Sequence, residues 1–251
     1  MAKLSEQAGL PNLASVNSEV ARRILRTGEV ELLGRMPWSS NATFIVVVRG
    51  AAGELLAIYK PRIGERPLWD FEEGSLCKRE VAAAQVAELL GWPLVPDTVL
   101  RDDLPHGVGS LQVFLDHDPD EHYFNLLSDH TDVFRRFGVF DVVVNNTDRK
   151  SGHLLRAATG SIFGIDHGVC FHEHWKLRTV IWEFGGEQLP VALLSDLECL
   201  SGRLRNDDHG LGDLISPAEM AAMIVRVDDL LANKHFPIGQ NDHRHYPWPL
   251  V

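Results

Sequence analysis

The sequence predicts an α+β protein in which a small antiparallel sheet comes first and a mostly helical region follows. In the first half of the chain, short apolar runs alternate with polar turns, which is typical of strands joined by hairpins. After Asp129 the apolar residues recur three and four positions apart, which indicates amphipathic helices. The 251 residues, 45% of them apolar, suffice to bury a large core in one domain or two lobes.

The first lobe is expected to span residues 34–116 and to contain a five-stranded sheet with one main helix. Residues 1–33 are predicted to form an extension that is loosely ordered up to residue 16. In this extension Ser18 should cap a helix that ends at about Thr27. The main helix is predicted at Leu76–Leu90, before Gly91-Trp92-Pro93. The strands are predicted at Val30–Leu33, Thr43–Val48, Leu55–Lys60, Val95–Leu100 and Ser110–Leu115.

The second lobe is expected to span residues 117–251. The acidic stretch Asp116–His122 is interpreted as the linker into it, and the tail from His235 is predicted to pack as an irregular strap. Ser216 and Glu219 have the spacing of a capping box at the start of the last helix. The helices are predicted at about Asp129–Asn145, Leu189–Gly202 and Ser216–Asn233.

Composition argues against several classes of protein. The formal net charge of −11 disfavours nucleic-acid binding and general adhesion to anionic membranes. Cys77, Cys170 and Cys199 lie far apart, so neither a disulfide framework nor a zinc site is expected, and a reducing cytoplasm fits them. No apolar run approaches the ~18 residues of a membrane span, and no secretory leader is evident. We therefore expect a cytoplasmic protein without stable membrane anchoring.

A buried ion pair is predicted between the sheet and the main helix. Lys60 shares a strand face with Leu56 and Ile58. Glu80 falls on an apolar stripe of the helix, where an unpaired carboxylate costs several kcal/mol, so a cation should lie nearby. Lys60 is our candidate for that cation. The alternative is that Lys60 reaches water at its strand end and Glu80 is solvated at the edge of the stripe.

Two polar stretches suggest a catalytic site. An apolar, helix-like run breaks at Asn145-Asn146, and the turn that follows carries Asp148, Lys150 and His153. Asp166 ends a strand-like run eighteen residues after Asp148, as a divalent-metal ligand opposite a catalytic loop would. Phosphoryl transfer from ATP requires a carboxylate to orient the hydroxyl, a cation on the γ-phosphate and metal ligands. These residues provide all three.

Four segments follow one another in a telling order, namely Tyr59-Lys60-Pro61, Gly109–Leu115, Asn146-Thr147-Asp148-Arg149 and Ile165-Asp166-His167-Gly168. In this order they resemble the phosphatidylinositol 3- and 4-kinase-like family, with Gly109–Leu115 similar to the family's hinge. The motifs are most similar to those of the type II phosphatidylinositol 4-kinases, in a bacterial branch, over roughly residues 34–172. The resemblance implies a bilobal protein-kinase-like fold and an ATP:hydroxyl phosphotransferase.

The resemblance also implies a role for each motif residue. Lys60 would hold the α- and β-phosphates of ATP, and Glu80 would hold Lys60. Asp148 would act as catalytic base, Lys150 would neutralise the γ-phosphate, and Asp166 would bind Mg²⁺ or Mn²⁺. The nucleotide would further contact the backbone of Gln112, Val113, Phe114 and Leu115 at its adenine edge, and Ile58 and Ile165 on its two faces. Independently of the resemblance, the Ser39-Ser40-Asn41 turn could cover phosphates through its N–H groups and hydroxyls, or be an ordinary hairpin turn.

One position departs from the family pattern. Five residues after the catalytic aspartate the family usually has asparagine as a second metal ligand, and this chain has His153. Imidazole favours manganese, zinc or cobalt over magnesium. Either the metal preference has shifted with His153 as a ligand, or His153 has left the metal shell, or the protein is a pseudokinase that binds nucleotide with little turnover.

The acceptor is expected to be a hydroxyl of a protein or of a small soluble molecule. Lipid kinases of this family present basic residues after the metal aspartate, whereas His167–Trp182 offers only Lys176 and Arg178, with Glu173 beside them. The cysteine-rich insert of type II lipid kinases is also missing. A lipid acceptor is therefore less favoured. Transfer of the nucleotide with ATP reversed is a further alternative.

Overall fold

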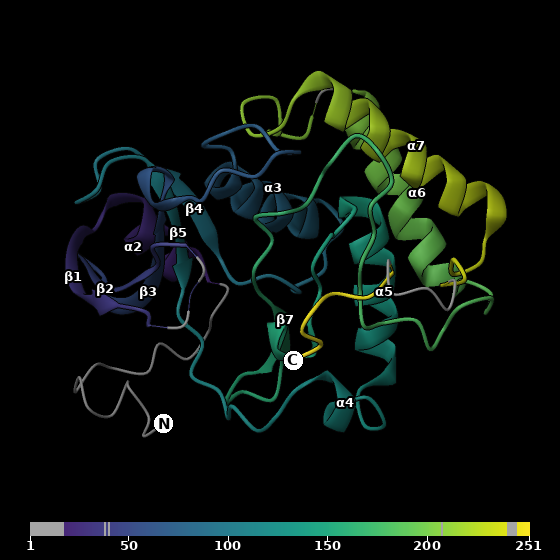
Figure 1. Cartoon of the computed structure of the whole chain (residues 1–251), viewed down its shortest axis with the longest axis horizontal. Helices are drawn as coiled ribbons and strands as arrows, with labels where there is room; N and C mark the ends of the chain where they lie inside the picture. The colour runs from purple at the N-terminus through teal and green to yellow at the C-terminus, as the bar shows by residue number, and fades with distance from the viewer. Residues whose placement is uncertain (1–17, 38, 40, 207, 240–244) are drawn as a thin grey trace.

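The first part of the chain folds into one antiparallel sheet of five strands (Figure 1). The structure, a computed structural model, describes residues 18–37, 39, 41–206, 208–239 and 245–251. The strand order is β1-β2-β3-β5-β4, so β5 pairs with both β3 and β4. The predicted sheet is confirmed, with strand ends shifted by a few residues. The strands are β1 (Glu29–Arg35), β2 (Phe44–Gly50), β3 (Gly53–Pro61), β4 (Thr98–Arg101) and β5 (Gly109–Val113).

Helix α2 (Glu19–Thr27) packs on this sheet. The Ser18 hydroxyl accepts a hydrogen bond from the N–H of Ala21 at 3.0 Å, so the predicted cap is confirmed. The apolar face of the helix shares one core with β2, β3 and β5. Arg22 pairs with Asp97 at 3.0 Å, just before β4, which ties the outer side of the helix to the sheet. Residues 1–16, predicted to be loosely ordered, lie outside the described residues.

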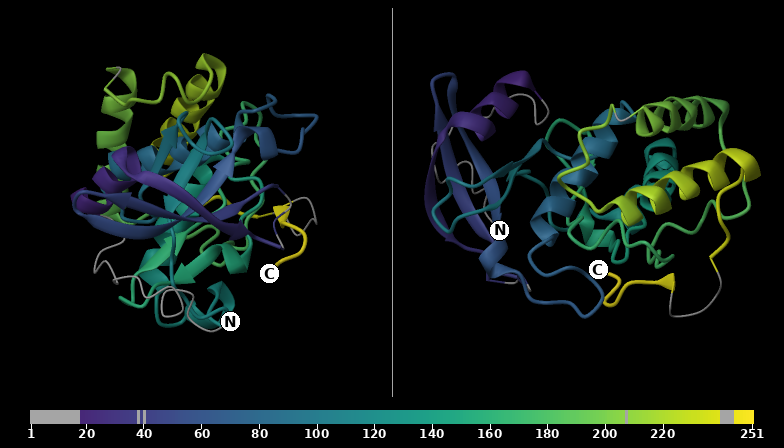
Figure 2. Two further views of the ribbon diagram at one scale, coloured as in Figure 1. Left: turned by 90° about the vertical axis from the view of Figure 1, so that its left-hand side faces the viewer. Right: turned by 90° about the horizontal axis from the view of Figure 1, so that it is seen from above.

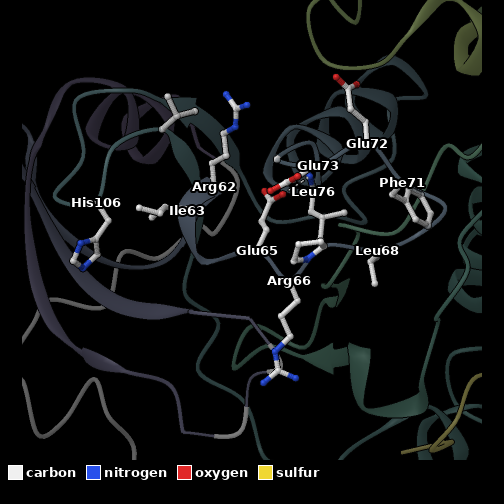
Figure 3. A pocket seen from close by; sticks show the side chains of 13 residues that line it. Arg62, Ile63, Glu65, Arg66, Leu68, Phe71, Glu72, Glu73, Leu76 and His106 are labelled. Carbon is white, nitrogen blue, oxygen red and sulfur yellow. Dashed lines mark hydrogen bonds between the residues drawn. The ribbon is translucent and has the colours of Figure 1, made fainter.

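Helix α3 (Leu76–Leu89) takes its N-terminal cap from the connection that precedes it. The Glu65 carboxylate accepts hydrogen bonds from the N–H groups of Leu76 at 3.0 Å and Cys77 at 2.8 Å. Negative charge is favourable there because it complements the helix dipole. Figure 3 shows Glu65 beside Leu76 in a pocket of about 540 Å³ next to the short helix η1 (Arg62–Gly64). Within the described part of the chain, no residue predicted for the site lines this pocket.

The second part of the chain is mostly helical and surrounds α5 (Thr131–Val144). Three aromatic residues of α5, namely Phe134, Phe137 and Phe140, are fully buried. Helix α6 (Val191–Arg205) packs on α7 (Pro217–Asn233), and α7 packs on α5. The three predicted long helices are therefore confirmed, and they lie at the end of the molecule opposite the sheet (Figure 2). None of the described helices is long and apolar enough to cross a membrane.

Short elements lie on either side of α5 along the chain. Strand β7 (Ile162–Gly164) coincides with the predicted strand-like run and pairs with β6 (Leu154–Arg156). Helix α4 (Tyr123–Leu126) precedes α5, and the short helix η2 (Ser151–His153) follows it. The sequence did not predict α4, η2 or β6, because three or four residues are too few to show a helix or strand period.

The C-terminal tail contacts the segment that follows α5. The N–H of Ser151 donates to the carbonyl of Leu250 at 2.8 Å, and the N–H of Thr179 donates to the carbonyl of His245 at 3.1 Å. These bonds satisfy backbone groups that neither helix nor sheet uses. The lobe boundaries predicted at residues 33 and 116 stay predictions.

Replacing Ser216 by alanine is expected to lower the free energy of unfolding by about 1 kcal/mol. Ser216 caps α7 by accepting from the N–H of Glu219 at 3.3 Å, while the Glu219 carboxylate accepts from the N–H of Ser216 at 2.9 Å. Urea unfolding checks this. Ser195→Ala, at an exposed position within α6, is the matched control and should change stability by less than about 0.5 kcal/mol. An equal loss in both variants contradicts the capping role.

Candidate active site

The sheet and the helical region face each other across a cleft of about 740 Å³. Residues from β3 and β5 line one side, and residues from the segments around η2 and β7 line the other. Ser40 lies outside the described residues. Every other residue predicted for the site lines this cleft, namely Ser39, Asn41, Ile58, Lys60, Glu80, Gln112, Val113, Phe114, Leu115, Asp148, Lys150, His153, Ile165 and Asp166.

Lys60 is the charge that joins the two sides of the cleft. Its Nζ lies 2.5 Å from Glu80 Oε1 and 2.5 Å from Asp166 Oδ1, so the pairing of Lys60 with Glu80 expected from sequence is present. The second oxygen of Glu80 accepts from the N–H of His167 at 3.0 Å. Burial opposes the charge on Lys60, but the carboxylates of Asp166 and Glu80 outweigh it and raise the pKa of Lys60. The lysine is thus a fixed cation at the centre of the cleft.

Asp166 follows β7 by two residues and lines the cleft. Its backbone has a φ of 59°, in the left-handed region that aspartate tolerates better than most residues. The ammonium group of Lys60 holds the pKa of Asp166 well below its usual range, so the carboxylate is ionised. Lys60 occupies Oδ1, and the side chain remains 47% exposed. Oδ2 is not used by Lys60 and lies 3.5 Å from His153 Nε2.

The loop that carries Asp148 is held by a buried ion pair. Arg149 Nη2 lies 2.9 Å from Asp141 Oδ1 on α5, and both side chains are 0% exposed. The same guanidinium contacts the carbonyl of Ile165 at 3.0 Å and His167 Nε2 at 2.7 Å. Arg149 therefore fixes the Asp148 loop and the Asp166 segment relative to each other. Sequence reasoning missed Arg149 and Asp141, although a lone carboxylate inside an apolar helix requires a partner.

Asp148 and Lys150 face the cleft together. Lys150 Nζ lies 3.0 Å from Asp148 Oδ2, and the N–H of Asp148 donates to Asn146 Oδ1 at 3.0 Å. Burial raises the pKa of Asp148, and the hydrogen bond and charge of Lys150 offset part of that effect. The pair provides a carboxylate that can accept a proton and an adjacent cation, at the side of the cleft opposite Lys60.

His153 ends η2 and lies between Lys150 and Asp166. Its Nδ1 accepts a hydrogen bond from the N–H of Lys150 at 3.4 Å, and its Nε2 lies 3.5 Å from Asp166 Oδ2. Burial lowers the pKa of His153 to about 4, so the ring is neutral at pH 7. Across the described residues, no three His, Cys, Asp or Glu side chains gather closely enough to hold a metal by themselves.

The hinge offers fewer donors than the sequence implied. The N–H of Val113 donates to the carbonyl of Asp97 and that of Phe114 to the carbonyl of Leu56, each at 3.0 Å. Among the described residues, the N–H of Leu115 has no hydrogen-bond partner. The N–H groups of Val113 and Phe114 are therefore already used within the protein, and the predicted contact of the Gln112–Leu115 backbone with the adenine edge stays a prediction. Leu115 supplies the free donor.

The cleft has an apolar part and a polar edge. Ile58 and Ile165 line its walls, as expected for the two faces of a planar ring. At the polar edge, Ser39 Oγ lies 2.8 Å from Thr43 Oγ1, and Asn41 Oδ1 accepts from the N–H of Arg66 at 2.9 Å. The Ser39 and Asn41 side chains both line the cleft and are both used in contacts within the protein.

The fold is kinase-like. The structure is similar to that of the Helicobacter pylori proinflammatory kinase CtkA, with a TM-score of 0.50 and 13% identity over 83% of this chain and 93% of that chain. At this identity the likeness shows the fold alone, and the predicted kinase-like α+β fold is confirmed.

Two sequence comparisons establish the family. The family model for phosphatidylinositol 3- and 4-kinase matches residues 70–200. Protein Rv2133c from Mycobacterium tuberculosis (strain ATCC 25618 / H37Rv) is 37% identical over 262 residues, which cover 90% of this chain and 94% of that protein. The chain belongs to the phosphatidylinositol 3- and 4-kinase family. The particular similarity to type II phosphatidylinositol 4-kinases stays a prediction.

Proposed function

We propose that the protein transfers the γ-phosphoryl group of ATP to a hydroxyl of a protein or a small soluble molecule. The observation that carries this proposal is the convergence of Lys60, Glu80, Asp148, Lys150 and Asp166 on one cleft. They come from four segments far apart in the sequence, and each has the charge that phosphoryl transfer requires at its place. Family membership supports the same type of chemistry.

The apolar part of the cleft suits the adenine ring. Ile58 and Ile165 would contact its two faces, and the free N–H of Leu115 would donate to its edge. Lys60, oriented by Glu80, would then meet the α- and β-phosphates. Because Lys60 already pairs with Asp166, ATP binding exchanges part of that ion pair for a lysine–phosphate contact. The cleft volume of about 740 Å³ is within the range usual for ligand pockets.

Asp166 would hold a divalent cation, Mg²⁺ or Mn²⁺. Magnesium in such sites is usually bound by one or two carboxylates plus phosphates and water, so a single ionised carboxylate fits. The pKa of Asp166 is low, the residue lines the cleft and Lys60 contacts its Oδ1 and not its Oδ2, which makes it a suitable ligand. When bound, the cation neutralises charge on the phosphates.

Asp148 and Lys150 would act on the transferred group. The hydroxyl proton passes to Asp148 while the acceptor oxygen forms its bond to the γ-phosphorus and the bond to the β–γ bridging oxygen breaks. ADP leaves with the negative charge of the broken bond. Lys150, 3.0 Å from Asp148, is placed to neutralise the γ-phosphoryl oxygens during this step. The two residues thus combine base and electrostatic catalysis.

The surface beside the cleft favours a soluble acceptor over a lipid. Lys176 follows the metal aspartate, where a phosphoinositide headgroup would need free cations. Its Nζ is 2.6 Å from Asp70 Oδ2 and lies 4.9 Å from the centre of the Trp69 ring. Its charge is already paired, and little remains to attract an anionic headgroup.

A pseudokinase is the second candidate, and His153 is the observation that favours it. The residue occupies the position of the family's second metal ligand. Loss of that ligand would leave nucleotide binding intact and weaken turnover. The intact set of Lys60, Glu80, Asp148 and Asp166 favours an active enzyme instead.

We expect the purified protein to convert ATP to ADP with Mg²⁺ or Mn²⁺ and to stop when EDTA is added. Casein, glycerol and phosphatidylinositol vesicles serve as separate acceptor probes, with ADP and pyrophosphate both quantified and products weighed by mass spectrometry. The Asp148→Asn protein, purified in parallel, controls for contaminating ATPase.

Each other outcome has a definite meaning. If pyrophosphate is released and an acceptor gains the mass of AMP, the protein transfers the nucleotide and not the phosphoryl group, and the proposal is wrong. Nucleotide binding without ADP under any metal favours the pseudokinase. Phosphorylation of the lipid vesicles overturns the acceptor class, and absence of nucleotide binding overturns the whole proposal.

A further inference from the structure

We propose that His153 binds no metal, that the protein holds a single divalent ion per bound nucleotide, and that the Nε2–H of His153 donates to a phosphate oxygen instead. This inference rests on the proposed function and names how the same site differs from the family pattern. The family's asparagine at this position is a metal ligand, whereas the geometry here makes the side chain a hydrogen-bond donor.

Nδ1 of His153 is a hydrogen-bond acceptor in the structure. It accepts the hydrogen bond from the N–H of Lys150 at 3.4 Å, while the N–H of His153 donates back to the carbonyl of Lys150 at 3.1 Å. The two bonds close the turn that forms η2. A backbone N–H points at Nδ1, so Nδ1 carries no proton. In a neutral imidazole the proton is then on Nε2.

Imidazole has fewer acceptor lone pairs than the amide that the family uses. An amide oxygen has two lone pairs, so asparagine can accept a backbone N–H and bind a metal with the same atom. A ring nitrogen has one lone pair, and the N–H of Lys150 uses it. A histidine that binds metal usually donates its other ring N–H to a neighbouring acceptor. In His153 the other ring nitrogen, Nδ1, faces the N–H of Lys150, so it accepts a hydrogen bond where a metal-binding histidine would donate one.

The alternative, flipped orientation of the His153 ring is unfavourable. Turning the ring over would remove Nδ1 from the N–H of Lys150 and put a C–H group there. That amide would lose the acceptor that it has in the structure. Leaving a donor without an acceptor is unfavourable. The observed orientation is therefore retained when the cleft binds a ligand.

The Nε2–H donor of His153 belongs to a side chain that lines the cleft. Nε2 lies 3.5 Å from Asp166 Oδ2, and it lines the same cleft as Lys60 and Lys150. A polyphosphate chain that meets both lysines passes this N–H, which can donate to one of its oxygens. This hydrogen bond would stabilise the phosphate charge at the position of the family's second metal ligand, without a second ion.

The experiment counts bound Mn²⁺ by electron paramagnetic resonance in the presence of saturating non-hydrolysable ATP analogue. We expect one Mn²⁺ per nucleotide complex in the wild type and in His153→Ala, and two in His153→Asn. His153→Ala should also bind the analogue about tenfold or more weakly, as for loss of a hydrogen bond to a charged group. His174→Asn is the matched control, because His174 is 77% exposed and lines no part of the cleft.

Two ions in the wild type and one in His153→Ala would overturn the inference, because His153 would then be a ligand. A ¹⁵N NMR spectrum of the histidine rings in the nucleotide complex gives an independent readout. A proton on Nε2 of His153 supports the inference, and a proton on Nδ1 overturns it. If the wild type binds no nucleotide analogue, the proposed function fails instead, so the two failures are distinguishable.

Discussion

Replacing Arg149 by methionine is expected to lower the free energy of unfolding by about 3–5 kcal/mol. The Arg149 and Asp141 side chains are both 0% exposed, and methionine would leave the Asp141 carboxylate in the core without its counter-charge. Asn146 and Thr179 still donate to this carboxylate, at 3.1 and 3.2 Å, but neither carries a charge. Guanidinium chloride unfolding, followed by circular dichroism, measures the loss.

The double variant Arg149→Met with Asp141→Asn tests the cause. Asparagine keeps an acceptor for Asn146, and its NH2 group can donate to the Thr179 hydroxyl in place of the second oxygen. Because it removes the unpaired charge, the double variant should recover more than about half of the loss. Arg205→Met is the matched control for removing an arginine. Its partner is Asp228, both side chains are 45% exposed, and a cost below about 1 kcal/mol is expected. A double variant as unstable as Arg149→Met shows that lost packing, and not the buried charge, dominates.

Local patterns in the sequence were sufficient for the architecture and for most of the cleft. Strand and helix periods depend only on neighbours in the chain, so the sheet, α3, α5 and α7 could be predicted. The pairing of Lys60 with Glu80 was also accessible, because a carboxylate on an apolar helix face requires a cation. That argument applies equally to Asp141, which lies within the buried face of α5. It was not applied there, and the Arg149 partner was missed.

Other contacts depend on register and on chain ends, which no local pattern encodes. Two contacts determine which N–H groups of the hinge are free. They are the pairing of β5 with β3 and the hydrogen bond from Val113 to the segment before β4. The cap of α3 comes from Glu65, eleven residues before the helix N–H that it binds. The strap contact from Leu250 to Ser151 joins the tail to the loop after α5. Each becomes visible only once the tertiary structure is known.

Replacing Asp148 by asparagine is expected to lower kcat by about 10²–10⁴-fold, the usual contribution of a positioned acid–base residue. Asparagine has the same shape but does not accept the hydroxyl proton. Asn146 holds the backbone N–H of residue 148, so the loop geometry should be kept. Since Asp148 acts after ATP binds, the KM for ATP should change little. Initial rates of ADP formation at varied ATP measure both constants.

The pH dependence of kcat separates a catalytic role from a structural one. The ionised form of Asp148 is the active form, so kcat should rise with pH through the pKa of this carboxyl. Burial raises that pKa above the usual range for aspartate, which moves the acid limb of the profile toward neutral pH. The Asp148→Asn variant should lose this acid limb. Asp103→Asn is the matched control, because the Asp103 carboxylate is 65% exposed in a surface ion pair. It should keep both the rate and the pH profile of the wild type. If Asp148→Asn retains the limb, another group titrates there and Asp148 only positions the acceptor.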